Sequence, residues 1–417
     1  MSDAMRDDDT VIPAIRLIRP SGQEQRATFF ELFFDLVYVF AITQLSHHLL
    51  AEHLSWQGAA ETAFMLVAVY WAWNYTTWMA NWFDPETAPV RLVLVFVMLA
   101  SLLMSVAIPR GFGDLALLFG CSYAALQIGR NAFVVAVTPP GVFHQNFRQI
   151  LAWSVLSAPL WVAGGLVDDA RWPLWLVALG LDLAAPLVRY WLPGVGDTPM
   201  SQWSIDGHHF AERFQLFIII ALGESIVLTG ATAAGTDLGA EVGLALGLSF
   251  LGSVALWWLY FTGASPVILH RMGHSTMTEV GALGRDIYTY LHLPIVGGIV
   301  LTAVGDELVV AHPDHEMEVV GAVAVLGGPA LYLLGLMACG IRVGHRVGWP
   351  AVVALVAMVA AVPVMANASG VVTSAFVLLV LGALAVAEHR RARAAHSRAH
   401  VPSGSLSDPR EHDHGNR

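Results

Sequence analysis

Apolar runs of roughly 20 residues recur along the whole 417-residue chain, separated by short segments rich in proline and glycine. As a helix, each run is long enough to cross the roughly 30 Å of hydrocarbon in a lipid bilayer. Hydrophobic residues make up 56% of the chain and charged residues 13%, whereas a typical soluble domain carries about 25% charged residues. The sequence therefore predicts an all-α fold, a polytopic transmembrane helical bundle whose surroundings are the lipid bilayer.

The apolar runs, punctuated by segments such as TPPG and LPGVGDTP, predict twelve membrane spans. The spans begin near Phe29, Gly58, Ala88, Gly111, Asn146, Arg171, His208, Leu238, Glu279, Glu316, Gly348 and Ser369. The predicted domains are a cytoplasmic N-terminal segment (1–27), a first transmembrane half (28–200), a second transmembrane half (201–390) and a disordered cytoplasmic tail (391–417).

The charged residues indicate how the spans are oriented. Much of the net charge of -11 comes from the N-terminus and from predicted soluble loops such as GDELVVAHPDHEMEV. With a cytoplasmic N-terminus, the outside loops hold only Arg110 and Arg171, whereas the inside segments hold most of the other arginines. Positively charged residues accumulate on the cytoplasmic side of membrane proteins. We therefore expect both termini in the cytoplasm.

Two patterns of aromatic and polar residues occur twice, in the same order. F-x-E-x-F spans residues 29–33 and again 210–214, and W-x-Y-x-T spans residues 73–77 and again 258–262. Because six is an even number, two halves of six spans would enter the membrane from the same side, as parallel repeats do. We predict two six-helix parallel repeats; the alternative is chance similarity among apolar helices.

Three longer stretches carry a family resemblance. ELFFDLVYVFAITQLSH in the first span, HFAERFQLFIIIALGESIV in the seventh and DIYTYLHLPIVGGIVLTAVG in the ninth resemble signatures of the bacterial low-temperature-requirement A family. Tyr38 stands where that family more often has phenylalanine. The resemblance covers nearly the whole chain and implies a multi-pass protein of the bacterial inner membrane. The family is named for a growth defect in the cold, which is a phenotype and not a biochemical activity.

Ionisable residues lie inside several predicted spans, where contact with lipid costs several kcal/mol. On the first span Glu31, Asp35 and Tyr38 share one helix face, and on the seventh His208 and Glu212 do the same. The predicted topology places further charges at the same cytoplasmic level, namely Arg130, Arg189, Arg285 and Asp286. We therefore expect the two carboxylates of the first span to pair with arginines from other helices.

This charge layer has two interpretations. It is either a structural network that fixes helix packing, or a vestibule or binding site for an ion, a proton or a small polar solute. Asp182, Glu224 and His292 lie deeper, without an obvious partner, and are candidate relay or coordination residues. Glu224 is the strongest candidate, because Gly223 and Ser225 beside it leave room for water or for a close helix. A carboxylate so far from both surfaces is suited to carrying a proton.

Sequence motifs of other functional classes are absent. No H-E-x-x-H, G-x-S-x-G or P-loop pattern occurs, and no basic and aromatic surface suggests a nucleic acid partner. His208, His209 and Glu212 could place a histidine and a carboxylate on one metal, but pairing at the membrane interface is the commoner role. We therefore expect no metal site, no cofactor and no enzymatic activity.

The predicted function is transport or permeation of a small polar or ionic solute. One alternative is a non-transporting membrane protein that is needed for growth in the cold or for adaptation of the cell envelope. Another is an intramembrane enzyme. The substrate, any coupling ion and the oligomeric state are left open by the sequence.

Overall fold

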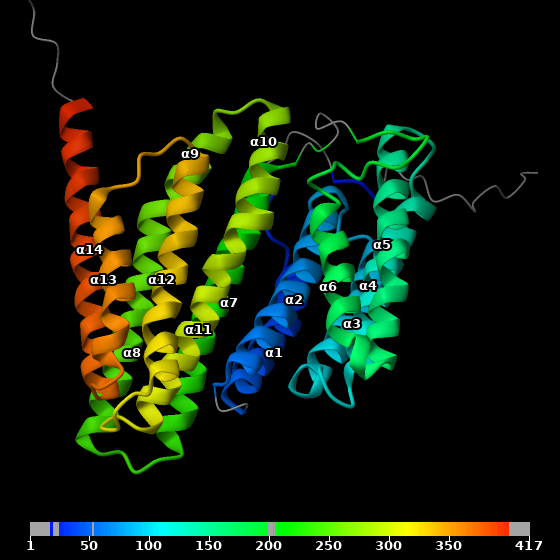
Figure 1. The fold of residues 1–417 in the computed structure, drawn as a ribbon. Coiled ribbons are helices and arrows are strands. Elements are labelled where there is room, and N and C mark those ends of the chain that lie inside the picture. Colours follow the sequence, from blue (N-terminus) through cyan, green and yellow to red (C-terminus); the bar gives the residue numbers. More distant parts are fainter. Residues whose placement is uncertain (1–16, 20–24, 52–53, 199–202, 204, 400–417) are drawn as a thin grey trace, which may run out of the picture.

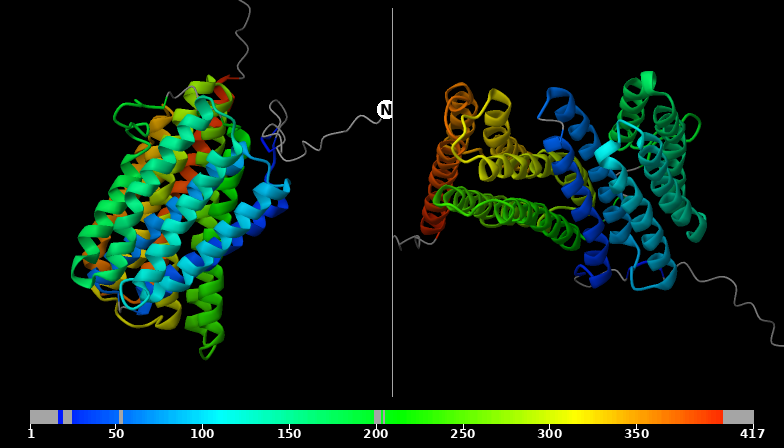
Figure 2. Two further views of the ribbon diagram at one scale, coloured as in Figure 1. Left: turned by 90° about the vertical axis from the view of Figure 1, so that its right-hand side faces the viewer. Right: turned by 90° about the horizontal axis from the view of Figure 1, so that it is seen from below.

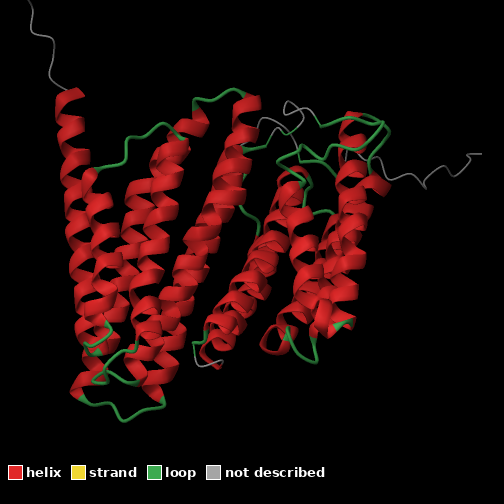
Figure 3. Cartoon of the chain, in the orientation of Figure 1, coloured by secondary structure: helices red, strands yellow, loops and turns green. Residues whose placement is uncertain are grey.

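Helices account for nearly all of the chain that the computed structural model describes, which is residues 17–19, 25–51, 54–198, 203 and 205–399. Figure 3 shows these helices, joined by loops. The described residues contain no β-strand, only three isolated β-bridges. The prediction of an all-α fold is therefore confirmed.

Twelve helical runs cross the bundle within the described residues. The first six are α1 (Phe29–Ala51), α2 (Trp56–Trp82), α3 (Ala88–Ala107), α4 (Ala116–Val137), α5 (Val142–Leu166) and α6 (Arg171–Ala184), with short 3₁₀ helices at η2 (Ile108–Arg110) and η3 (Asp168–Ala170). The next are α7 (Gly207–Ala234), α8 (Ala240–Trp258) joined to α9 (Ser265–Gly273) by the π-helical η5 (Leu259–Ala264), and α10 (Met277–Leu283) joined to α11 (His292–Ala311) by the π-helical η6 (Gly284–Leu291). The last three are α12 (Val319–Arg342), α13 (Trp349–Met365) and α14 (Gly370–Ala399).

Each run begins close to a predicted start, and the largest difference is at α4, which begins at Ala116 where Gly111 was predicted. Eight runs are long and apolar enough to cross a membrane: those that contain α1, α3, α5, α7, α8, α11, α12 and α14. The chain is therefore built as a multi-pass membrane protein. The remaining runs are α2, α4, α6 and α13, so the count of twelve membrane spans stays a prediction.

α2 is long but comparatively polar. Asn74, Thr76, Thr77 and Asn81 in its C-terminal half are all buried. Polar residues in a membrane protein face the interior of the bundle because lipid offers them no hydrogen bonds. α2 satisfies this rule by lying among α1, α4, α7 and α11, which cover its polar residues.

The helices stand side by side, and neighbours in the chain run in opposite directions (Figure 1). α1 packs against α2 and α3, and in a similar way α7 packs against α8 and α11. The two predicted halves meet where α1 and α2 contact α7 and α11. Seen from below in Figure 2, the blue α1 and α2 lie between the green and yellow helices of the second half and the cyan helices of the first. Whether the halves are true repeats stays a prediction.

α11 and α12 approach each other closely at glycines. A Cβ atom on Gly298 would lie 2.5 Å from the backbone nitrogen of Tyr332, and one on Gly328 would lie 2.5 Å from the backbone nitrogen of Thr302. No larger side chain fits at such distances, and small residues of this kind let membrane helices pack backbone to backbone. The acidic residues further along α11 are thereby held on a rigid helix pair.

The C-terminal helix extends further than predicted. We predicted a disordered tail from residue 391, but α14 continues to Ala399. The segment RRARAAHSRA is rich in alanine and arginine, two residues with high helix propensity, so it continues the helix beyond the apolar part. Residues 400–417, and residues 1–16 of the predicted N-terminal segment, lie outside the described residues.

Candidate functional site

Glu31 and Thr28 form a reciprocal cap at the N-terminal end of α1. The hydroxyl of Thr28 accepts a hydrogen bond from the backbone N–H of Glu31 at 3.2 Å, and Oε2 of Glu31 accepts one from the backbone N–H of Thr28 at 2.8 Å. This capping arrangement fixes the Glu31 side chain against its own first helical turn. The second carboxylate oxygen is left to face another helix.

That second oxygen contacts three basic side chains. Oε1 of Glu31 accepts a hydrogen bond from Arg213 at 2.9 Å, lies 3.1 Å from Nε2 of His209 and lies 2.9 Å from the guanidinium of Arg19. His209 and Arg213 are four residues apart, so they project from the same face of α7 toward α1. Glu31 therefore joins α7 and the segment before α1 to the start of α1.

Asp35 lies one turn further along α1 and shares the same arginine. Oδ1 of Asp35 accepts a hydrogen bond from Arg213 at 2.6 Å and another from the indole N–H of Trp73 in α2 at 2.8 Å. Asp35 and Arg213 are both fully buried. We call Arg19, Glu31, Asp35, His209 and Arg213 the paired layer.

The paired layer balances its charges, with two carboxylates and two guanidinium groups in mutual contact. Burying an ion is costly unless an opposite charge and hydrogen bonds compensate it, and here they do. The geometry therefore suits a fixed connection between α1, α2 and α7 at the end of the bundle where α1 begins.

The arginine in this layer is not one of those that the sequence indicated. We considered Arg130, Arg189 and Arg285 as partners, whereas the partner from another helix is Arg213, together with Arg19. The F-x-E-x-F repeat includes Glu212, which projects from a different face of α7 than His209 and Arg213 do. The spacing of His209 and Arg213, four residues apart in an apolar run, was the available indication of the correct face.

The two residues predicted on α7 lie beside the paired layer rather than in it. His208 is exposed, and the buried histidine is His209. Glu212 is half-buried, and its Oε2 accepts a hydrogen bond from the backbone N–H of Ala27 at 2.8 Å. The inward face of the helix is thus displaced by one residue from the predicted one.

Arg130 and Asp182 belong to a different buried network, inside the first half. Arg130 donates hydrogen bonds to Gln127 and, at 3.1 Å, to Thr76; the amide of Gln127 donates to the hydroxyl of Tyr123 at 3.0 Å. Tyr123 in turn donates to Oδ2 of Asp182 at 3.0 Å. This chain connects α2, α4 and α6, and it includes no residue of the paired layer.

Tyr38 and His292 are also buried and have hydrogen-bonding partners. The hydroxyl of Tyr38 lies 2.8 Å from that of Ser101 in α3. Nε2 of His292 lies 2.9 Å from the hydroxyl of Tyr260, and its Nδ1 lies 3.0 Å from the carbonyl oxygen of Ile287. His292 is therefore part of an aromatic packing core rather than a residue without a partner.

Asp286 lies at the edge of the bundle and is only partly buried. Its carboxylate lies 2.7 Å from the guanidinium of Arg285 and 2.7 Å from that of Arg342 in α12. Arg189 forms an ion pair with Asp197 in the loop that follows α6. These predicted members of the charge layer thus form separate pairs and do not reach Glu31 or Asp35.

Glu224 lies on the same face of α7 as the paired layer, eleven residues beyond Arg213, which is roughly 17 Å at 1.5 Å per residue. It is 2% exposed; its Oε2 accepts a hydrogen bond from Thr43 of α1 at 2.8 Å, while its buried Oε1 has no hydrogen-bond partner among the described residues. Because Glu31 contacts Arg213 and Thr43 contacts Glu224, α1 and α7 run in the same direction.

Two further carboxylates, which the sequence predicted in a soluble loop, belong to the helix that packs against α7. Asp306 and Glu307 lie inside α11, which continues to Ala311. Oδ2 of Asp306 accepts a hydrogen bond at 2.8 Å from Ser225, the neighbour of Glu224, and Glu307 lies within electrostatic range of Glu224. We call Glu224, Asp306 and Glu307 the acidic cluster.

The acidic cluster differs from the paired layer in its charge. Among the described residues, no arginine forms an ion pair with any of its three members. One oxygen of Glu307, like one of Glu224, is buried without a hydrogen-bond partner in this part of the structure. Within the residues that the structure describes, no group of three or more His, Cys, Asp or Glu side chains is placed to hold a metal ion.

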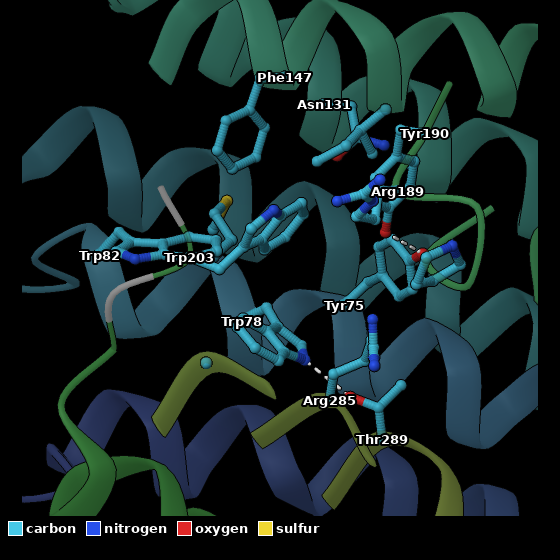
Figure 4. A pocket seen from close by; sticks show the side chains of 14 residues that line it. Tyr75, Trp78, Trp82, Asn131, Phe147, Arg189, Tyr190, Trp203, Arg285 and Thr289 are labelled. Carbon is cyan, nitrogen blue, oxygen red and sulfur yellow. Dashed lines mark hydrogen bonds between the residues drawn. The ribbon is translucent and has the colours of Figure 1, made fainter. Parts of the chain in front are cut away.

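A pocket lies elsewhere, between the end of α2, α4, α5, residues 186–190 and the α10–η6 run (Figure 4). None of the predicted candidate residues lines it, but Arg189 and Arg285 of the predicted charge layer do. Its other walls are mostly aromatic, including Trp78, Trp82 and Trp203. The pocket is thus a separate feature at the interface of the two predicted halves.

Comparison with known proteins identifies the family. Residues 26–386 match the family model of the bacterial low temperature requirement A protein (LtrA). The chain belongs to this family. It is also 39% identical over 324 residues to the uncharacterized protein RA0937 of Rhizobium meliloti (strain 1021), an alignment that covers 77% of this chain and 78% of the relative. No solved structure matches. The matched region contains Glu31, Asp35, His209 and Arg213 of the paired layer and the whole acidic cluster, whereas Arg19 precedes it.

Proposed function

We propose that this LtrA-family protein transports a small polar or ionic solute across the bacterial inner membrane, and that Glu224 carries a proton or binds a cation during transport. The observation that supports this proposal is the acidic cluster, three carboxyl groups in apolar helices without an arginine partner. The substrate itself stays open.

The position of Glu224 suits such a role. Its carboxylate lies where α7 meets α1, and one oxygen is bound by Thr43 while the other has no partner among the described residues. In transporters built from two halves, solute and ion sites lie near the middle of the membrane at the interface of the halves. Thr43 belongs to the first predicted half and Glu224 to the second, so the carboxylate is at that interface.

The charge of the cluster favours a cation as its ligand. Ionised carboxylates buried together repel one another, and each is costly to bury alone. Among the described residues no arginine pairs with Glu224, Asp306 or Glu307, although His47 lies in electrostatic range of Glu224 and Glu307. A proton or a small cation would therefore stabilise these carboxylates. The half-buried position of Glu307 and the exposed His47 nearby give the cluster a route toward solvent.

Polar side chains continue from the cluster into the second half. Ser225 donates to Asp306, and Ser253 of α8 donates to Ser225 at 3.2 Å. Asp306 also lines a small cavity with Thr302 and Ser374 of α14. Polar groups thus extend from α1 through α7 and α11 to α8 and α14, which is the kind of path that a hydrated solute needs.

The test replaces Glu224 with its neutral isostere. Glu224→Gln should abolish cold-growth complementation in a strain that depends on the gene, and should abolish proton uptake into liposomes that contain the purified protein. The matched control is Glu61→Gln, because Glu61 is also buried in a helix but has two partners, Gln57 at 2.9 Å and His48 at 3.4 Å. If Glu224→Gln complements fully, Glu224 carries no proton and the transport proposal loses its main support.

A second candidate function is structural, and the paired layer favours it. Its charges are compensated and its groups are closely hydrogen-bonded, as expected of a network that maintains helix packing. A protein of this kind would be needed in the cold for the integrity of the envelope and would move no solute. In that case Arg213→Gln would impair growth in proportion to its loss of stability, and Glu224→Gln would be harmless.

The orientation in the membrane is proposed from the arginine distribution. Both termini lie in the cytoplasm, which places the start of α1 and the paired layer on the cytoplasmic side. Reporter fusions after Leu50, Thr232 and Gly370 should all report the outside, and a fusion at Arg417 the inside. A cytoplasmic report from any of the first three would contradict the predicted twelve-span topology.

A further inference from the structure

The aromatic pocket has two chemically different sides. Figure 4 shows the side chains of Trp82, Trp203, Trp78 and Phe147 on one side, and those of Arg189 and Arg285 on the other, next to Tyr75 and Tyr190. A pocket with one apolar wall and one cationic wall is suited to a ligand that has an apolar body and an anionic group.

The aromatic wall is well ordered by contacts among its rings. Trp203 packs edge-on against Trp78, with ring centres 5.7 Å apart, and stacks on Tyr190 at 5.4 Å with an interplanar angle of 19°. The indole N–H of Trp78 donates to the hydroxyl of Thr289 at 2.9 Å, which fixes that ring. These rings present a preformed apolar surface, so a ligand need not order it on binding.

The cationic wall is formed by Arg189 and Arg285, and each of them also forms an ion pair. Arg285 and Arg342 share the carboxylate of Asp286, each at 2.7 Å, while Arg189 pairs with Asp197. Of these three arginines, Arg189 and Arg285 line the pocket. A guanidinium has five N–H donors in a planar fork, so one group can bind more than one acceptor.

Arg189 occupies a helix-ending turn that requires a left-handed backbone but does not require an arginine. Arg189 and Tyr190 both have φ of +54°, a left-handed conformation that is unfavourable for residues with a Cβ atom. The backbone N–H of Tyr190 donates to Ala185 and that of Arg189 to Pro186, the pattern that ends a helix and normally has glycine at the position of Arg189. Glycine would adopt this conformation at a lower cost in free energy. The presence of arginine at this position therefore indicates a role for its side chain.

A π-helical segment contributes the second arginine of the pocket. Arg285 and Thr289 both belong to η6, in which the hydrogen-bonding pattern departs from that of the α-helices on either side. π-helical insertions are rare and frequently occur at functional sites. The left-handed turn at Arg189 and the π-helical η6 come from different predicted halves, and both border this pocket.

From this geometry we propose that the pocket binds an amphiphilic anion. The apolar body of the ligand lies against Trp78, Trp82 and Trp203, and its single negative group accepts hydrogen bonds from Arg189 and Arg285. An anionic lipid and a soluble aromatic sulfonate or carboxylate share this chemistry. The proposal concerns a binding site and does not depend on whether the protein transports anything.

The experiment measures binding of two probes to the full-length purified protein. Phosphatidylglycerol is tested by native mass spectrometry, with phosphatidylcholine as the neutral reference, and naphthalene-2-sulfonate is tested by calorimetry in an uncharged detergent, with 2-naphthylmethanol as the neutral reference. We expect at least one anionic probe to bind at least ten-fold more tightly than its neutral reference. Binding of only the first probe identifies a lipid site, and binding of only the second identifies a site for a soluble anion.

The variants separate ligand recognition from folding. Arg189→Gly relieves the left-handed strain, so its melting temperature should equal or exceed that of the wild type while anion binding weakens at least ten-fold. Arg285→Gln should weaken binding to a similar extent. The matched control is Arg91→Gln, because Arg91 is an exposed, ion-paired arginine near the same end of the bundle, 3.0 Å from Glu86, and does not line the pocket.

Three results would overturn the proposal. The first is that neither anionic probe binds the wild type, and the second is that the neutral references bind as tightly as the anions. The third is that Arg189→Gly and Arg285→Gln bind the anion as tightly as Arg91→Gln does. A well-folded Arg189→Gly that has lost binding is the outcome that a merely structural role of Arg189 does not produce.

Discussion

Glu31 and Glu224 are both buried glutamates at the junction of α1 and α7, yet their surroundings are opposite in charge. Glu31 contacts Arg19, His209 and Arg213 within the paired layer. Glu224 accepts a hydrogen bond from the hydroxyl of Thr43, and the titratable groups in its electrostatic range are Glu307 and the exposed His47. The same pair of helices thus holds one carboxylate with compensation and another, roughly 17 Å away, without it.

The difference teaches that burial alone does not identify a functional carboxylate. Both residues would be marked as intramembrane charges by their position in the sequence. The paired layer has what a structural network requires, opposite charges with good hydrogen-bond geometry. The acidic cluster lacks that compensation, so it is the better candidate for exchange of a proton or cation. Three predictions test this contrast.

Arg213→Gln should have the largest effect on stability. The arginine joins Glu31 and Asp35, and its removal leaves two carboxylates buried without their main partner. Breaking a buried ion pair by removing one member costs roughly 3–5 kcal/mol. Thermal unfolding in detergent should therefore show a large decrease in melting temperature, if the variant folds at all.

The control for this variant is again Arg91→Gln, whose exposed ion pair is worth about 0–1 kcal/mol. A second comparison uses the triple variant Glu31→Gln, Asp35→Asn, Arg213→Gln, in which neutral groups replace both carboxylates and the arginine that joins them, while Arg19 keeps its charge. It should be more stable than Arg213→Gln alone, because no unpaired carboxylate remains. Equal stability of Arg213→Gln and Arg91→Gln would show that the paired layer is not a structural network.

Asp35→Asn should have an intermediate effect. The amide oxygen can still accept from Trp73, but the charge-assisted hydrogen bond from Arg213 is weakened, and such bonds contribute about 1.5–3 kcal/mol. The control is Asp84→Asn, because Asp84 lies in the loop after α2 and its side chain accepts only a local hydrogen bond from Glu86 at 2.9 Å. Equal melting temperatures for the two variants would mean that the pairing of Asp35 contributes nothing.

Glu224→Gln should have the smallest effect on stability, about 1 kcal/mol or less, although it abolishes function under the transport proposal. A neutral amide copies a protonated carboxyl and can still accept the hydrogen bond from Thr43. The measurement is thermal unfolding of the same protein preparation that is used for liposomes. If Glu224→Gln unfolds as readily as Arg213→Gln, then Glu224 is ionised and paired, and the contrast between the two regions is wrong.

The helices themselves were predictable because the apolar runs are long and their ends are marked by proline, glycine and charge. The predicted starts at Phe29, Ala88 and Arg171 are the observed starts of α1, α3 and α6. A helix in lipid must satisfy its own backbone, so local sequence is sufficient to locate it. Where the sequence marks the end of a helix only weakly, as around Asp306 and Ala399, the helix continues beyond the predicted end.

The partners of the buried residues were less predictable. A residue's helical face is set by the rotation of the whole helix, and a shift of one residue changes every contact, as His209 and Arg213 show in place of His208 and Glu212. Ion pairs also require two helices to be at the right height. Arg130 is buried, but it bonds to Thr76 and Gln127 within the first half and not to the carboxylates of α1.

The sequence by itself determined that this is an all-α, multi-pass membrane protein of the LtrA family, because apolar run length and family motifs are local properties of the chain. It also identified Glu31, Asp35 and Glu224 as carboxylates that lipid cannot accept. Only the tertiary structure decided that the first two are neutralised by Arg213 while the third lies with Asp306 and Glu307. Electrostatic compensation depends on distances of a few ångströms between helices, and those distances are set by the packing of the whole bundle.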